Sequence, residues 1–151
     1  MQVALHTRFA GTMLLRDHVD RDTEFIALLN AYRASGGLYR ADEIADLLRR
    51  HGMENYMRLA RRLAGREILS FRWNEVIWIP AFQLRGTELE VREEVCEVLD
   101  ELVPVMEGFE IAQWFVTPNL WLGGAAPLRM IHSCGLAVKD AARADRFIIK
   151  G

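Results

Sequence analysis

Apolar residues in the first half of the chain recur with the period of an α-helix. Three stretches show this spacing and predict helices over residues 23–34, 42–51 and 54–64. The last two helices are short and meet at a turn that contains Gly52, which is the pattern of a helix-turn-helix. The side chains expected to face inward are Phe25, Leu28, Leu29, Tyr32, Ile44, Leu47, Leu48, Met57, Ala60 and Leu63, and Tyr56 is a further candidate.

The pattern then changes to that of β-strands. Residues 68–73 and 76–79 are rich in β-branched and aromatic side chains and flank Asn74-Glu75, which predicts a hairpin with a two-residue turn. Asn74 suits such a turn, whereas Glu75 disfavours the positive φ that the turn requires. Because the hairpin directly follows the helix over 54–64, the layout predicts a winged helix-turn-helix.

Helical spacing returns in the second half. It predicts helices over residues 87–103, 107–115 and 136–149, a short helix that begins at Pro127, and an irregular apolar loop over 119–124. The chain is therefore expected to be mainly α with a small β-hairpin. The predicted boundaries are an N-terminal helical extension over residues 1–36, a winged helix-turn-helix-like region over 37–85 and a helical domain over 86–151. The chain shows neither an apolar run of membrane-spanning length nor a secretory signal.

Charge is distributed unevenly, although the formal net charge is only −2. Residues 38–73 hold eight arginines against five acids, whereas residues 86–110 hold nine acids against the single base Arg92. The total excludes an overall basic nucleic-acid binder, but a local basic surface can still face a polyanion. Candidate DNA contacts are Arg58, Arg61, Arg62 and Arg66 on or next to the second short helix, and Arg72 and Asn74 near the hairpin tip. The alternative is an ordinary solvated surface.

Candidate catalytic chemistry is sparse. His132, Ser133 and Cys134 are consecutive, but no partner for a nucleophile can be identified, and Cys134 is interpreted as a small buried apolar residue. The four histidines show no metal-ligand spacing with one another or with the cysteines, Cys96 and Cys134. We therefore expect that the protein is not an enzyme and that it holds neither a metal nor a cofactor. Two cysteines fit reduced thiols in a cytoplasmic protein better than a disulfide scaffold.

Residues 114–131 contain more large apolar side chains than a short loop needs for its own burial. Two interpretations remain open. These side chains either join the last helices to one another, or form an exposed patch for a partner.

The same run carries a family resemblance. Its residues Trp114, Thr117-Pro118-Asn119, Leu122-Gly123-Gly124 and Pro127-Leu128 resemble the signature of the toxin-binding domain of Xre/MbcA/ParS-type antitoxins. The segment Trp78-Ile79-Pro80-Ala81-Phe82-Gln83-Leu84 resembles the one that follows the DNA-binding region in such proteins. The resemblance covers residues 38–151. The chain departs from the pattern at Trp121, at Ala125-Ala126 and in a basic helix unlike that of Cro-type repressors.

The resemblance implies a dimeric helical antitoxin of a type II toxin-antitoxin system. Such a protein neutralises a partner toxin, commonly an NAD-degrading enzyme, by covering its active site, and often represses its own operator. Carried over by position, the residues that face the toxin or define the domain are Trp114, Pro118, Asn119, Leu122, Gly123, Gly124 and Pro127. Alternatives are a free-standing transcription regulator that keeps the domain for dimerisation, and an adaptor with no role on DNA.

Overall fold

The computed structural model describes residues 20–151 and is mainly helical, with two small antiparallel sheets. No helix in this part of the chain combines the length and the apolar character needed to cross a membrane. The expectation that the chain begins without a secretory signal concerns residues outside the described part. After a helix over residues 20–32, the elements are η1 Arg33–Ser35, β1 Leu38–Arg40, α2 Ala41–Arg50, α3 Met53–Ala64, β2 Phe71–Trp73, β3 Val76–Pro80, η2 Ala81–Gln83, β4 Leu84–Arg85, β5 Glu90–Val91, α4 Glu93–Leu102, α5 Gly108–Val116, η3 Leu120–Leu122, α6 Pro127–Met130 and α7 Gly135–Lys150.

The predicted hairpin is confirmed as strands β2 and β3. Phe71 faces Trp78 and Trp73 faces Val76 across the pair. Asn74 and Glu75 both adopt positive φ, 45° and 64°, as a twist-matched two-residue turn requires. Strand β1, which the sequence pattern did not predict because it has only three residues, pairs with the other edge of β3. The strand order is therefore β1-β3-β2, with α2 and α3 inserted between β1 and β2.

The predicted helix over 87–103 is wrong at its beginning. Residues 84–91 form a second hairpin, in which Leu84 pairs with Val91 and Arg85 with Glu90. The chain reverses where Gly86 and Leu89 take positive φ, and helix α4 starts only at Glu93. Two strands of two residues each are too short to produce an alternating pattern, so the acidic residues before α4 resembled a continuation of the helix.

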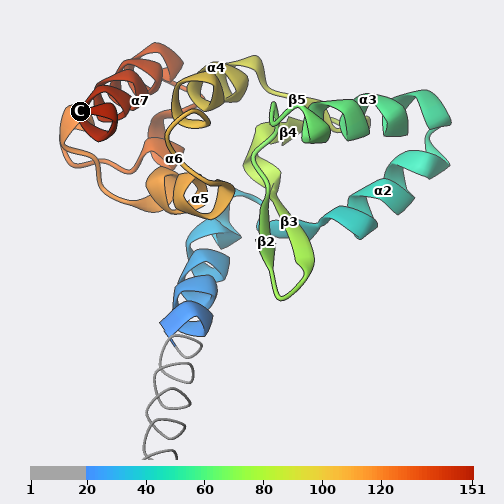
Figure 1. Cartoon of the computed structure of the whole chain (residues 1–151). Coiled ribbons are helices and arrows are strands. Elements are labelled where there is room, and N and C mark those ends of the chain that lie inside the picture. The colour runs from blue at the N-terminus through green and yellow to red at the C-terminus, as the bar shows by residue number, and fades with distance from the viewer. Residues whose placement is uncertain (1–19) are drawn as a thin grey trace, which may run out of the picture.

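A large core joins the N-terminal helix to the C-terminal half (Figure 1). Leu28 and Tyr32 pack with Val98, Phe115 and Val138, which come from three C-terminal helices. The Tyr32 hydroxyl donates a hydrogen bond of 2.6 Å to the Ala112 carbonyl, and burial raises the pKa of Tyr32 well above its ordinary value, so the hydroxyl stays protonated. Part of the predicted extension is thus built into the same core as residues 95–142.

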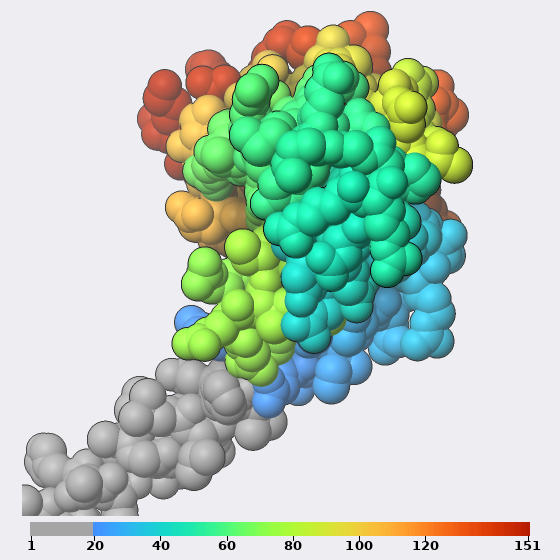
Figure 2. All heavy atoms as spheres, turned by 90° about the vertical axis from the view of Figure 1, so that its right-hand side faces the viewer, coloured from blue at the N-terminus to red at the C-terminus, as the bar shows by residue number. Residues whose placement is uncertain are grey.

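Helices α2 and α3 cover a smaller core and occupy the centre of the face shown in Figure 2. Ile44 and Leu48 of α2 are buried as predicted, but Leu47 is 42% exposed. In α3 the buried residue is Leu59, and the predicted inward residue Met57 is 43% exposed. The apolar residues of α3 form one broad stripe with Leu59 and Met57 at its two edges, so the sequence period identified the face but not which edge of it packs on the core.

Gln83, which follows strand β3, is hydrogen-bonded to Leu69 in the segment before strand β2. Its side chain is fully buried, accepts a hydrogen bond from the Leu69 amide at 2.8 Å and donates to the Leu69 carbonyl at 2.8 Å and the Pro80 carbonyl at 3.1 Å. An amide side chain can satisfy a backbone donor and acceptor together, which an apolar residue of the same size cannot. The polar residue in the Trp78–Leu84 segment therefore has a structural role.

Helix α4 packs along α7 and is paired with it by charge. Glu97 lies 3.7 Å from Lys139, and Glu101 accepts hydrogen bonds from Arg143 and Arg146 at 3.0–3.1 Å. Desolvation acts to raise the pKa of Glu101, but the hydrogen bonds and charges of the two guanidinium groups outweigh it and lower that pKa. Part of the negative charge of α4 is thus paired with cations of α7 in the same molecule.

Candidate functional site

The loop between α5 and α7 is organised around the carboxylate of Asp145. Its Oδ2 atom accepts hydrogen bonds from Trp114 Nε1 at 2.8 Å and from Asn119 Nδ2 at 2.9 Å, and its Oδ1 atom accepts one from Trp121 Nε1 at 3.0 Å. The three donors come from α5 and from the loop, whereas Asp145 comes from α7. One acidic side chain therefore fixes the loop against the last helix.

Asn119 closes the loop on itself. Its Oδ1 atom accepts a hydrogen bond from the Trp121 amide at 2.9 Å, and its carbonyl accepts one from the Gly124 amide at 2.9 Å. Gly123 and Gly124 have φ of 65° and 87°, a backbone conformation that residues with a Cβ atom adopt at a cost. The Asn…Gly-Gly spacing of the sequence thus encodes a tight loop.

Several large apolar side chains on and near this hydrogen-bonded loop are exposed to solvent. Leu120 is 94% exposed and Trp121 is 59% exposed, although both lie beside the anchored residues. The last turns of α7 add Phe147 at 81% and Ile148 at 66%. A hollow of about 520 Å³ lies between the loop and α7. The residues that line it are Trp114, Thr117, Pro118, Asn119, Leu120, Trp121, Asp145 and Ile148. We call this hollow the Asp145 groove.

The residues expected to face a toxin divide into two groups. Trp114, Asn119, Leu122 and Pro127 are buried in the chain itself, so they shape the loop. Pro118, Gly123 and Gly124 are exposed. Leu120 and Trp121 belong to the run 114–131 that the sequence offered as an exposed patch, whereas sequence reasoning missed Asp145, Phe147 and Ile148 as parts of the surface. The apolar run Phe147-Ile148-Ile149 at the end of an amphipathic helix was a signal that could have found Phe147 and Ile148, but nothing in the sequence links Asp145 to the loop.

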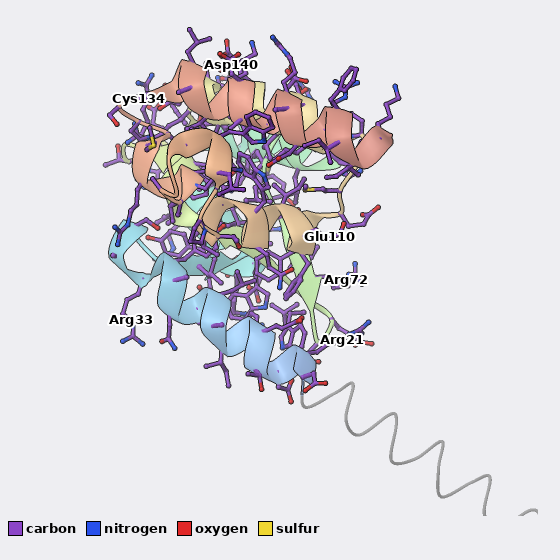
Figure 3. The ribbon with its side chains drawn as sticks, turned by 90° about the vertical axis from the view of Figure 1, so that its left-hand side faces the viewer. Arg21, Arg33, Arg72, Glu110, Cys134 and Asp140 are labelled. Carbon is purple, nitrogen blue, oxygen red and sulfur yellow. The ribbon has the colours of Figure 1, made fainter. Side chains whose placement is uncertain are left out.

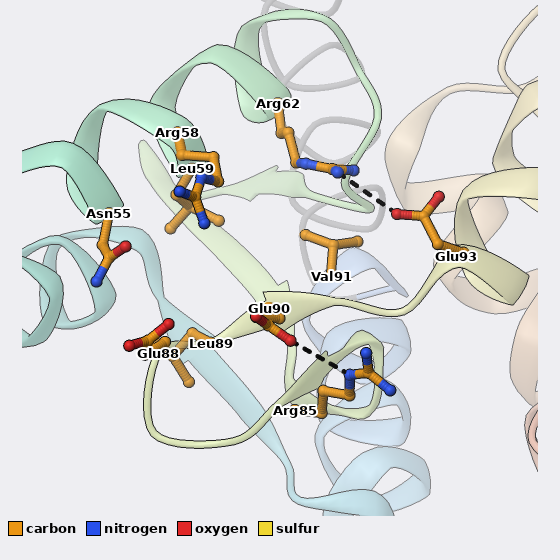
Figure 4. A pocket seen from close by; sticks show the side chains of 10 residues that line it. All are labelled: Asn55, Arg58, Leu59, Arg62, Arg85, Glu88, Leu89, Glu90, Val91 and Glu93. Atoms are coloured by element: carbon orange, nitrogen blue, oxygen red, sulfur yellow. Dashed lines mark hydrogen bonds and ion pairs between the residues drawn. The ribbon is translucent and has the colours of Figure 1, made fainter.

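The six candidate DNA contacts do not share one surface. Arg58 and Arg62 line a hollow of about 270 Å³ between α3 and the β4–β5 hairpin, together with Arg85 and three glutamates (Figure 4). Arg66 and Arg72 line a different hollow beside the start of α5. Arg61 is exposed on α3, and Asn74 is exposed at the tip of the β2–β3 hairpin.

Several of these arginines are already paired. Arg58 lies 3.5 Å from Glu54, and Arg66 lies 3.7 Å from Glu107. Arg62 is 3.5 Å from Glu93 and 3.7 Å from Glu67, so its charge joins α3 to the start of α4. Among the described residues, Arg61 and Arg72 form no ion pair. They are therefore the two candidate arginines whose charge is free for a polyanion.

The residues considered for chemistry are scattered. Cys134 is exposed at the start of α7 (Figure 3), which corrects the interpretation that it is buried; the chain turns outward there to begin the helix. His132 Nδ1 lies 3.1 Å from Glu94 Oε1, so its hydrogen-bonding partner is a glutamate of α4 and not Cys134. Burial and the nearby Glu93 raise the pKa of the Cys96 thiol, against the influence of Arg62. Within residues 20–151, no three His, Cys, Asp or Glu side chains are grouped as metal ligands.

Comparison of the chain with protein-family models, with curated proteins and with solved structures found no match. The resemblance to Xre/MbcA/ParS-type antitoxins therefore rests on the sequence motif alone.

Proposed function

We propose that this protein is the antitoxin of a type II toxin-antitoxin system and neutralises a partner toxin by binding it through Leu120, Trp121, Phe147 and Ile148. The observation that carries the proposal is the exposure of these four large apolar side chains, of which Leu120, Trp121 and Ile148 line the Asp145 groove beside the hydrogen-bonded loop. The motif resemblance lies in the same loop. In this proposal the protein acts in the cytoplasm as a homodimer, without a cofactor and without turnover, and the toxin can be an NAD-degrading enzyme.

The physical basis is burial of a preorganised apolar surface. Fully burying a large apolar side chain contributes roughly 1.5–3 kcal/mol, and aromatic residues are prominent among the residues that dominate protein interfaces. Because Asp145 and Asn119 already hold Trp121, little conformational freedom is lost when a partner covers it. A flexible loop of the same composition would bind more weakly.

The proposal is tested by co-expression with the product of the neighbouring reading frame, measuring growth rescue and complex formation. Replacing Leu120→Ser together with Trp121→Ala removes two exposed anchors, and we expect the affinity to fall by at least about 100-fold. The matched control is Ile26→Ser, which also removes an exposed apolar side chain, 56% accessible, but on the N-terminal helix. Equal rescue by the double variant and the control contradicts the proposal.

Operator binding is a second candidate function, supported by Arg61 and Arg72, which form no ion pair within residues 20–151, and by two helices followed by a hairpin. For a protein that neutralises phosphates, the logarithm of the binding constant falls with the logarithm of the salt concentration by about 0.9 per phosphate contact. We expect Arg61→Ala with Arg72→Ala to flatten this slope on DNA from upstream of the gene. Arg129→Ala, an exposed arginine of α6, is the control. An unchanged slope removes this surface from the interface.

A further inference from the structure

Asp145 is the one charged residue among the side chains that line the Asp145 groove. Its three hydrogen bonds come from two indoles and one amide, all of which are neutral donors. Two neighbouring cations on α7, Arg143 and Arg146, are directed to Glu101. Within residues 20–151, no ion pair includes Asp145. The Asp145 carboxylate therefore lies among mostly apolar side chains, and no cation of the described residues is paired with it.

The three hydrogen bonds occupy acceptor sites of the Asp145 carboxylate, but none of them comes from a cation. Oδ2 accepts two hydrogen bonds and Oδ1 accepts one, whereas the two oxygens together offer about four acceptor sites. Charge-assisted hydrogen bonds from a cation are roughly twice as strong as those from neutral donors. Asp145 is partly buried, so such a contact is screened less by water than one on an open surface.

We propose that the Asp145 groove binds the cationic side chain of a partner protein, an arginine or a lysine, with its charge on Asp145 and its methylene stem along Trp121, Pro118 and Leu120. The stems of these residues pack well on apolar surface, and a guanidinium also stacks on aromatic faces. Arginine is favoured, because its charge is delocalised and less strongly hydrated than an ammonium group. The carboxylate repels phosphate, so the occupant is a basic protein segment.

This inference rests on the proposed function only for the identity of the partner, because it names the group that a toxin would insert. It therefore has a test that needs no toxin. The probes are N-acetyl-arginine amide and N-acetyl-citrulline amide, which have closely similar shapes but differ in charge. The signals of the indole Nε1–H groups of Trp114 and Trp121, observed by NMR with the full chain, report on the groove directly.

The expected result is a saturable shift of both indole signals with the arginine probe, and binding at least about tenfold weaker with the citrulline probe. Asp145→Asn should abolish the difference between the probes. Asp140→Asn, on the outer side of the same helix (Figure 3), should preserve it. Equal shifts with both probes, or no shift with either, overturn the inference.

A second pair of variants leaves the hydrogen-bonded loop intact. Leu120 is almost fully exposed at the edge of the groove, so a charge placed there acts on the bound probe without disturbing the core. We expect Leu120→Lys to weaken binding of the arginine probe and Leu120→Glu to strengthen it, each by about two- to fivefold. Changes in the same direction for both variants contradict the inference, since only an electrostatic effect reverses with the sign of the charge.

The outcomes separate this inference from the proposed function. If the arginine probe fails to bind but the toxin complex forms and depends on Leu120 and Trp121, the inference is wrong and the proposed function stands. If the probe binds but growth rescue is absent, the groove recognises a basic side chain and the antitoxin proposal fails. Probe-competitive self-association, measured by sedimentation, would show that a second copy supplies the cation and overturns the assignment to a different protein.

Discussion

The α5–α7 loop and the arginine-bearing region of α3 and the β2–β3 hairpin are both rich in residues typical of binding surfaces, but they are constructed in opposite ways. In the loop, polar groups lie inside around Asp145, and the apolar Leu120 and Trp121 lie outside. In the arginine region, Arg62 and Arg66 are turned to acids of the C-terminal half. Residue type alone therefore does not identify a binding surface; what matters is which groups the fold leaves unmatched.

The largest effect is expected from Asp145→Ala. The substitution leaves the Trp114 indole and the Asn119 amide, both in largely buried residues, without an acceptor. An unsatisfied buried donor costs about 1–3 kcal/mol, so we expect a loss of about 2–4 kcal/mol in the free energy of unfolding. Urea unfolding, followed by tryptophan fluorescence, measures it.

Asp140→Ala is the control for this substitution. Asp140 is exposed on the same helix and faces Arg143 only at 4.0 Å. Its removal should change the free energy of unfolding by less than about 0.5 kcal/mol. If the two variants are equally stable, the loop is not held by Asp145, and the contrast between the two regions disappears.

The mainly helical fold and the hairpin could be predicted because their patterns extend over many residues. The period of α2 and α3 and the aromatic strands around Asn74-Glu75 each give a repeated signal. Strands of two or three residues, such as β1, β4 and β5, give none. The sequence also cannot show that Leu28 and Tyr32 belong to the C-terminal core, since that depends on tertiary contacts.

The candidate surface could be predicted only in part. The motif pointed to the α5–α7 loop, but most of its residues with a distinctive type, such as Trp114 and Asn119, are distinctive because they build the loop. The exposed members are ordinary apolar residues, and Leu120 could equally have been buried. Asp145 is separated from its donors by 24 to 31 residues, so its role becomes visible only in three dimensions.

An intermediate effect is expected from Glu101→Gln, which tests whether charge pairing also stabilises the C-terminal half. Glu101 is 12% exposed and accepts hydrogen bonds from Arg143 and Arg146. We expect a loss of about 1–2 kcal/mol in the free energy of unfolding at pH 7.

The pH dependence of the same variant follows from the lowered pKa of Glu101. Because folding lowers this pKa, the stabilisation is present above the pKa of the unfolded chain and is lost as the pH falls through the pKa of the folded protein. The difference in stability between the original protein and Glu101→Gln should therefore shrink between about pH 5 and pH 3. A difference that stays constant over this range, in urea unfolding at matched ionic strength, contradicts the assignment.

The smallest effect is expected within α3 itself, where Arg61 and Arg62 are neighbours with different surroundings. Arg62 is 30% exposed and lies near Glu67 and Glu93, whereas Arg61 is exposed without an ion pair in the described part of the chain. Arg62→Ala should lower the free energy of unfolding by about 0.5–1 kcal/mol and Arg61→Ala by less than about 0.5 kcal/mol, because partly exposed ion pairs contribute little. DNA binding should show the reverse order, with the greater loss for Arg61→Ala, since its charge is not already matched. Parallel changes in both measurements would mean that the ion pairs of Arg62 do not hold its charge away from DNA.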